Sequence, residues 1–302
     1  APERSPRRRG CAATRKRSRV LTYVGLVVAS CVAVFPLLFM VFSSFKEDHQ
    51  IFADLGSFKA FLPTGHLSLD NYSGVFERVP AVRFITNSLI VTVAIVLLGL
   101  IVNSMIGFAI SRMRWRSKNI VLSLVLATLM VPFETIAVPL VYWVAKLPSL
   151  QWVVDGFLVK QGMLNTYQVQ ILPFVANALS IFLFAQHFGD IPKEIDEAAR
   201  VDGASWWVIY SRIIVPLSGP TFATVAIITM LPAWNSYLWP LMVIQEESMR
   251  PASVGMQYFF QLNPVWGQIM AYGTLITLPV LIIFVLFQRS FVASLAGTAV
   301  KG

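Results

Sequence analysis

Few side chains in this sequence are spaced for catalysis. The three histidines, His49, His66 and His187, are scattered along the chain, so neither an acid–base cluster nor a metal site is predicted. The two cysteines, Cys11 and Cys31, form no Cys-x-x-Cys or Cys/His pattern, which gives no support to a disulfide framework or a zinc site. A Gly-x-x-x-x-Gly-Lys-[Ser/Thr] phosphate loop is absent from the sequence. We therefore predict no catalytic residue, no metal site and no cofactor-binding site in this chain.

The segment 189–217 has the most informative spacing of charged, small and glycine residues. Asp190 is predicted to cap a short helix, with Pro192 in its first turn. Gly203 fits a helix end that requires a positive φ, and Ser205 can cap a second helix that begins at Trp206. The segment is thus predicted to form a helix, a glycine turn and a second helix.

One face of the first of these helices is predicted to be an apolar stripe. Its members follow helical spacing, and they are Ile191, Ile195, Ala198, Ala199 and Asp202. The small alanines allow a partner to approach closely, and Glu197 offers one directed charge. Together these features suit a helix that docks against a partner protein. The alternative that these residues leave open is an ordinary amphipathic helix between two spans.

The composition indicates burial in a lipid bilayer. The chain has 302 residues, of which 56% are hydrophobic and 13% charged, with a net charge of +9. A soluble domain is usually about 45–50% apolar and about 25% charged. The basic residues stand in short clusters between apolar runs, as in membrane proteins, so we do not expect nucleic-acid binding.

About six apolar runs are long enough to cross roughly 30 Å of hydrocarbon as helices. They lie near residues 20–42, 84–110, 119–145, 167–187, 218–244 and 269–288. The expected fold is therefore all-α, a polytopic membrane helical bundle that follows a basic tail at 1–19. Removal of the first run as a signal peptide is the alternative. The 24 basic residues split 17 to 7 between the two sides, which places both termini and the segment 189–217 in the cytoplasm.

The segment 189–217 also carries a resemblance to a known family. Glu197-Ala198-Ala199, then Gly203, then Ile213-Ile214-Val215-Pro216 resembles the EAA motif of binding-protein-dependent ABC importer permeases, although Val215 replaces the usual leucine. Further runs look like the MalG-like group of carbohydrate permeases: Ser44-Phe45-Lys46, Asn87-Ser88-Leu89, Met130-Val131-Pro132, Trp234-Asn235-Ser236-Tyr237-Leu238-Trp239-Pro240 and Ala299-Val300-Lys301-Gly302. The basic tail and the stretch 146–160 look longer than is usual in the group, so no function is carried onto them.

The resemblance implies a permease subunit of an ABC importer for a sugar, an oligosaccharide or a related polyol derivative. In this family the EAA loop is the coupling helix that sits in a groove of the ATPase. The implied coupling residues are Glu197, Ala198, Ala199, Asp202 and Gly203. The implied partners are a second permease subunit that completes a heterodimeric pore, an ABC ATPase dimer that binds ATP and Mg, and an extracytoplasmic solute-binding protein. The expected location is the inner membrane of a prokaryote, and the chain itself is not expected to be an enzyme.

Polar side chains within membrane helices usually face the bundle interior, and sugars are bound by aromatic faces together with hydrogen-bonding groups. The predicted substrate-pathway residues are Asn87, Asn103, Glu134, Asn177, Trp234, Asn235 and Tyr237. Glu134 is informative because an acidic residue at the centre of a span costs about 2.5–3.5 kcal/mol on the insertion scale. Its alternative is a structural carboxyl beside Pro132 and Pro139.

A secondary transporter driven by ions or protons is the competing function. Such a protein would be expected to carry relays of charged residues within its spans and often internal repeats. Here Glu134 is the one acidic residue within the predicted spans, and no repeat is seen.

Overall fold

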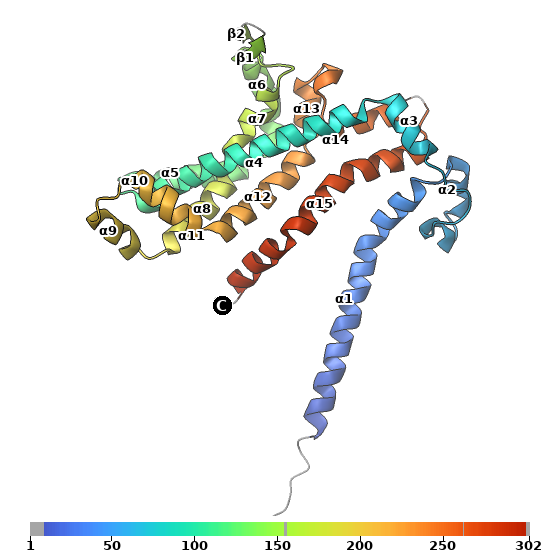
Figure 1. Cartoon of the computed structure of the whole chain (residues 1–302), viewed down its shortest axis with the longest axis horizontal. Helices are drawn as coiled ribbons and strands as arrows, with labels where there is room; N and C mark the ends of the chain where they lie inside the picture. Colours follow the sequence, from blue (N-terminus) through green and yellow to red (C-terminus); the bar gives the residue numbers. More distant parts are fainter. Residues whose placement is uncertain (1–8, 154–155, 262, 300–302) are drawn as a thin grey trace, which may run out of the picture. The chain divides into compact units, whose positions relative to one another are not determined.

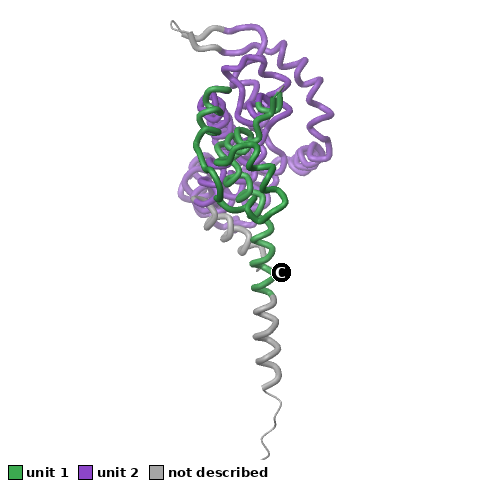
Figure 2. The backbone as a smooth tube through the Cα atoms, turned by 90° about the vertical axis from the view of Figure 1, so that its right-hand side faces the viewer, with its two compact units in different colours: residues 1–78, 259–275 green, residues 79–258, 276–302 purple. Residues whose placement is uncertain are grey.

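The computed structural model describes residues 9–153, 156–261 and 263–299. The chain divides into two compact units, which Figure 2 colours separately. The first unit comprises residues 1–78 and 259–275, and the second comprises residues 79–258 and 276–302. We describe each unit by itself.

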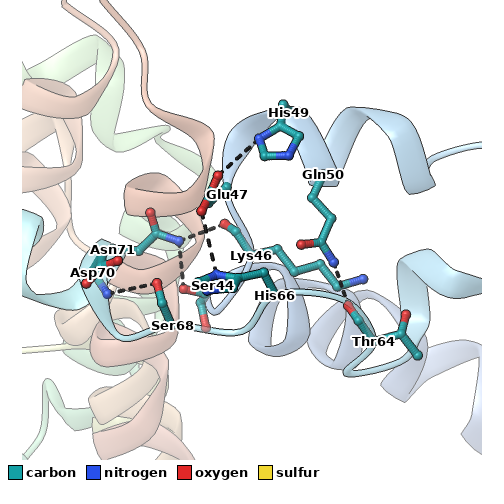
Figure 3. Close-up of polar contacts among 10 residues, drawn as sticks. All are labelled: Ser44, Lys46, Glu47, His49, Gln50, Thr64, His66, Ser68, Asp70 and Asn71. Carbon is teal, nitrogen blue, oxygen red and sulfur yellow. Dashed lines mark hydrogen bonds and ion pairs between the residues drawn. The ribbon is translucent and has the colours of Figure 1, made fainter.

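The first unit is built around the end of a long apolar helix. Its elements are α1 (Arg9–Ser43), α2 (Asp48–Asp54), the 3-10 helix η1 (Phe58–Phe61), α3 (Asp70–Arg78) and the first part of α15 (Trp266–Ala299). Asn71 on α3 holds the chain where α1 ends, because its Nδ2 donates to the carbonyls of Ser44 at 3.0 Å and Lys46 at 2.8 Å (Figure 3). The Lys46 ammonium is buried, and it pairs with Asp54 at 2.9 Å.

The second unit contains the remaining helices and one hairpin. In chain order they are α4 (Ala81–Arg112), α5 (Lys118–Ala127), η2 (Thr128–Met130), α6 (Phe133–Val144), β1 (Pro148–Val153), β2 (Gly156–Gln161), α7 (Tyr167–Val175), α8 (Ala178–Asp190), α9 (Glu194–Val201), α10 (Trp206–Val208), the π-helix η3 (Ile209–Ile214), α11 (Val215–Leu217), α12 (Gly219–Trp234), α13 (Leu238–Val243), η4 (Glu247–Met249) and α14 (Ala252–Gly255). The 3-10 helix η5 (Met256–Phe259) and α15 cross the boundary between the units.

The predicted helical membrane fold is confirmed. Thr22–Ser43, Ala81–Arg112 and Trp266–Val285 are each long and apolar enough to cross a membrane. Three bent helix pairs add to them if each pair is one span, which gives up to six spans within the described residues. With 32 residues, α4 is about 48 Å long at about 1.5 Å per residue, so its two ends can lie beyond opposite faces of the hydrocarbon layer.

Proline explains the sharpest interruption of a predicted span. The segment predicted near 119–145 bends by 102° between η2 and α6. The residue before a proline is biased away from the helical region, and Val131, which precedes Pro132, has φ −91° and ψ 114°. The apolar run therefore continues through the bend while the helix does not.

A second interruption separates α7 from α8. The two helices meet at an angle of 42°, and Ala176 and Asn177 between them are extended. The Asn177 side chain then accepts a hydrogen bond from the amide of Ser180 at 3.0 Å, which caps α8. The apolar run predicted near 218–244 is also divided, because α12 ends at Trp234 and α13 begins at Leu238.

One hairpin lies between the predicted spans near 119–145 and 167–187. Strand β1 pairs antiparallel with β2, and Ser149 lies opposite Lys160. Both strands are rich in apolar, β-branched and aromatic residues, which favour extended structure. The hairpin is a local exception in a helical fold.

The core of the second unit lies between α4, α8 and the segment that follows α9. It is formed by the buried side chains of Phe108, Phe184, Phe188, Ile209, Tyr210, Ile214 and Val225. Gly107 allows α4 to approach α8, because a Cβ on it would lie 2.6 Å from the Cβ of Phe184 and 2.9 Å from a backbone nitrogen. The end of α4 is therefore packed firmly against the elements around α9.

Candidate functional site

The helix α9 ends in a glycine turn, as the sequence predicts. Gly203 has a φ of +82°, and it donates to the carbonyl of Arg200 at 3.0 Å while Ala204 donates to that of Ala199 at 2.9 Å. This pair of bonds is a Schellman motif, which satisfies carbonyls that the helix end leaves free. An added Cβ at Gly203 would meet nothing within 4 Å, so backbone conformation rather than space requires the glycine.

The start of α9 differs from the prediction, whereas the second helix does not. Asp190 is the last residue of α8, and α9 begins at Glu194 without a side-chain cap. The predicted N-cap role of Asp190 is wrong because α8 continues farther than the apolar run indicates. The second helix does begin at Trp206, and Ser205 accepts a hydrogen bond from the amide of Val208 at 3.4 Å.

A buried ion pair ties α9 to the end of α4. Arg112 Nη1 lies 3.1 Å from Asp196 Oδ2, and the side chains are 1% and 8% exposed. Arg112 Nη2 also donates to the carbonyl of Ile191 at 2.7 Å. Burial raises the pKa of the Asp196 carboxyl above its usual range, the Arg112 guanidinium opposes this shift, and Glu197 adds to it.

Aromatic contacts hold the second helix against the same part of α4. The ring of Phe108 lies 6.1 Å from that of Trp206 and 5.3 Å from that of Tyr210. The Tyr210 hydroxyl is 2.7 Å from the Ser104 hydroxyl, also on α4. Arg200 lies over the Trp206 ring at 4.9 Å, which links α9 to α10. The segment 189–217 is thus a rigid extension of the end of α4 (Figure 1).

The opposite face of α9 has no cover from the described part of the chain. Glu194, Glu197, Ala198 and Val201 are exposed at helical spacing, and Val201 is 89% exposed. The predicted apolar stripe is therefore only partly correct, because Ala199 packs against the core whereas Ala198 and Asp202 point outward. Of the predicted coupling residues, Glu197, Ala198, Asp202 and Gly203 share the accessible side.

Sequence reasoning missed Arg112, Asp196 and Val201. In the sequence, Arg112 is one of the positive charges that fix the orientation of the chain in the membrane. Asp196 is one of the polar residues between two predicted spans. A usable signal was present, because Asp196 lies three residues before Ala199 and so shares the inward side of the helix with it. An acidic residue on an apolar helix face calls for a buried partner.

A cavity of about 460 Å³ lies at the two helix breaks of the second unit. Its wall includes Thr128 and Val131 at the first break, Ala176 and Asn177 at the second, and Thr229 on α12. Of the seven predicted pathway residues, all of which lie within the described ranges, Asn177 alone lines this cavity.

Two of the other predicted pathway residues brace the backbone. Asn87 donates to the carbonyls of Ser248 at 3.0 Å and Arg250 at 2.9 Å, and it accepts from the Tyr167 hydroxyl at 2.7 Å. Asn103 donates to the carbonyl of Val175 at 2.9 Å and accepts from the amide of Asn177 at 2.9 Å. Asn87 thus holds the loop after α13 against the start of α4, and Asn103 spans the α7–α8 break.

The remaining four predicted pathway residues are dispersed. Glu134 is exposed in the first turn of α6, where a negative charge favours the helix dipole. Trp234 is buried, and its Nε1 donates to the carbonyl of Ile276 at 3.2 Å. Asn235, the residue after α12, donates to the carbonyl of Leu231, and the Tyr237 hydroxyl contacts Gln257. Their contact with a substrate stays a prediction.

Comparison with known proteins gives a family match over most of the chain. The family described as "Binding-protein-dependent transport system inner membrane component" matches residues 95–297. The arabinooligosaccharides transport system permease protein AraQ of Halalkalibacterium halodurans is 33% identical over 295 residues, which cover 95% of this chain and 99% of that protein. The sn-glycerol-3-phosphate transport system permease protein UgpE of Brucella abortus is 31% identical over 291 residues, with coverage of 93% and 97%.

Solved structures show the same fold. A chain of a bacterial ABC transporter involved in the import of the acidic polysaccharide alginate aligns with a TM-score of 0.75. The alignment covers 96% of this chain and 99% of that one at 19% sequence identity. At that identity the likeness supports the arrangement of helices and says nothing of the cargo.

Proposed function

Since this chain belongs to the family of binding-protein-dependent transport system inner membrane components, we propose that it is one pore subunit of an ATP-driven importer for a carbohydrate or a related polyol derivative. It is a multi-pass protein of the inner membrane. The carbohydrate assignment is supported by relatives whose names give arabinooligosaccharides and sn-glycerol 3-phosphate as cargo. ATP and Mg bind to a separate ATPase, and this chain is not itself an enzyme.

The observation that carries this proposal is that one face of α9 is exposed while the helix itself is fixed to α4. Glu197, Ala198 and Val201 form a small apolar and acidic surface that the described part of the chain leaves free. The Arg112–Asp196 pair fixes α9 to α4, so a displacement of α9 also moves α4. Movement of a rigid element between two packed arrangements is a common way to transmit work across a protein. We assign this face as the contact with the ATPase.

The two ends of α4 are assigned to opposite sides of the membrane. The distribution of basic residues supports a cytoplasmic location for α9 and for both termini. The opposite end of α4, where Asn87 holds the loop at Ser248 and Arg250, then faces the extracytoplasmic side. A solute-binding protein would deliver cargo there, and a second permease subunit would complete the pore.

Substitutions on α9 test the coupling. Glu197→Ala removes the directed charge, and Gly203→Asp adds a charge and a side chain at the positive-φ position. Both variants are expected to lower ATP-dependent uptake of labelled sugar at least tenfold, while immunoblots show unchanged amounts in the membrane. Glu77→Ala is the matched control, because it removes an exposed glutamate on α3, outside both surfaces that are assigned to partners.

The outcomes separate the competing mechanisms. Normal uptake in both α9 variants would remove the coupling assignment. Uptake by the unchanged protein that survives ATP depletion and collapses with the proton gradient would indicate a secondary transporter instead.

A further inference from the structure

We propose that the second unit of this chain contains its own binding subsite for an uncharged saccharide, in the cavity between the two helix breaks. The proposal rests on the proposed function, and it adds a place and a chemical class for the cargo. The cavity measures about 460 Å³, within the range of roughly 300–1,000 Å³ that is usual for small-molecule sites.

The first argument is that two helix breaks border the same cavity. Thr128 and Val131 line the cavity where η2 ends, and Ala176 and Asn177 line it where α7 ends. Non-helical backbone within a membrane protein is tolerated only where protein covers it or where it borders a hydrated cavity. Discontinuous membrane helices border the substrate site in several transporter folds, and the two breaks place such helix ends around this cavity.

The second argument is an unsatisfied acceptor in the wall. Gln170 on α7 is 1% exposed and lines the cavity. Its Nε2 donates to the carbonyl of Met249 at 3.3 Å, but its buried Oε1 has no hydrogen-bond partner among the described residues. A buried acceptor without a partner is unfavourable, so Gln170 is a polar side chain of the wall whose hydrogen bonding the described residues leave incomplete.

Further hydroxyl and amide groups surround the same space. Thr229 on α12 and Asn177 at the start of α8 lie in the wall with Ser88 and Ser236. Neutral donors and acceptors of this kind match sugar hydroxyls, each of which can donate and accept. Convergent polar groups in a mostly apolar pocket fix the orientation of a ligand.

The third argument is an aromatic wall. Phe133 and Phe174 both line the cavity, and their ring centroids lie 5.4 Å apart. Trp239 supports them from behind at 5.8 Å and 6.2 Å, and its own Nε1 donates to the carbonyl of Val169. The apolar faces of sugar rings pack against aromatic rings held in this way.

The lining also excludes one class of cargo. Among the described residues that border the cavity, none is Asp, Glu, Lys, Arg or His. A phosphate group in such a space would lack a compensating charge, which is unfavourable in a low-dielectric interior. The subsite therefore fits a neutral saccharide and disfavours a phosphorylated polyol.

The test uses the complete transporter, in proteoliposomes with its partner permease, ATPase and binding protein. Thr229→Val and Gln170→Leu remove polar groups from the cavity. Thr224→Val is the matched control on the same helix, because Thr224 bonds to the carbonyl of Pro220 in its own helix and does not border the cavity. The probes are labelled arabinotriose, lactose, maltotriose and sn-glycerol 3-phosphate, and sugar uptake is measured together with ATP hydrolysis.

We expect both cavity variants to lower the maximal rate of sugar uptake at least fivefold, with ATP hydrolysis stimulated by the loaded binding protein within twofold of the unchanged transporter. The Thr224→Val variant should match the unchanged transporter in both measurements. The Thr229→Val substitution preserves the shape of the side chain. Its uptake measurement therefore still tests the subsite if the Gln170→Leu variant fails to assemble into a transporter.

Each contrary result has its own meaning. If the Thr229→Val variant takes up as much sugar per ATP hydrolysed as the unchanged transporter, the subsite is overturned. The importer assignment then remains intact. Transport of sn-glycerol 3-phosphate at the rate of the sugars would overturn the claim that the cargo is uncharged. Failure of the unchanged transporter to import any of the four probes would remove the proposed function, and the subsite with it.

Discussion

At the scale of single residues, the Arg112–Asp196 pair links α9 to α4, a helix long and apolar enough to cross a membrane. Its side chains are 1% and 8% exposed, so neither charge has the solvent that would compensate for the loss of the other. Removal of one partner from a buried pair typically costs about 3–5 kcal/mol, whereas replacement of both by apolar residues is often neutral. The pair therefore matters for stability mainly because each charge compensates for the cost of burying the other.

This argument predicts a non-additive pair of substitutions. Arg112→Met alone should destabilise the protein by about 3 kcal/mol, because Asp196 is left buried without a partner. The double substitution Arg112→Met with Asp196→Leu should recover most of that loss. Thermal unfolding of the purified transporter in detergent measures both effects. Equal losses in the single and double variants would mean that the two charges do not compensate each other.

At the scale of elements, the helix breaks depend on side chains from a neighbouring helix. The break between α7 and α8 frees the carbonyl of Val175 and the amide of Asn177 from helical bonding. Asn103 on α4 bonds to both, each at 2.9 Å. An amide side chain supplies both donors and an acceptor, so it suits this gap better than any apolar residue of similar size.

Asn103→Leu is therefore expected to destabilise the second unit. Two backbone groups would lose their partners, at about 1–3 kcal/mol each, and the lower melting temperature would be seen in detergent. Asn235→Leu is the matched control, since the side chain of Asn235 is exposed and donates to the carbonyl of Leu231. Its effect should stay within about 0.5 kcal/mol. Equal melting temperatures for the two variants would show that the break does not need Asn103.

At the scale of the whole molecule, the two surfaces that we assign to partners lie at opposite ends of α4. The α9 face is uncovered at one end of α4, and the loop braced by Asn87 lies at the other. A Val201→Cys variant, with Cys11 and Cys31 replaced by serine, should react with an impermeant maleimide in inside-out vesicles. Co-expression of the ATPase should slow that reaction at least fivefold, because Val201 would then be covered.

Ser57→Cys in the same cysteine-free background supplies the comparison for sidedness. Ser57 is exposed in the segment after α1, which the charge distribution assigns to the outer side, so it should react in intact cells. Reaction of the cysteine at position 201 in intact cells would place α9 outside and remove the importer assignment.

The amino-acid sequence by itself determined the class of the fold and the position of the glycine turn. About 20 apolar residues in a row must be buried in lipid or protein, and that requirement depends on composition alone. Gly203 was also predictable, because a positive φ at a helix end is a local property of the backbone. The start of the second helix at Trp206 follows equally from its neighbour Ser205.

Only the tertiary structure decided which charges pair, how strongly the spans bend and which polar residues meet. Hydropathy adds up residue by residue, so it is the same for a straight helix and for one bent by 102° at Pro132. Asp196 and Arg112, or Asn103 and the α7–α8 break, are distant in the chain and become neighbours only when helices pack. The free energy of a buried polar group depends on that distant partner, and no local pattern specifies it.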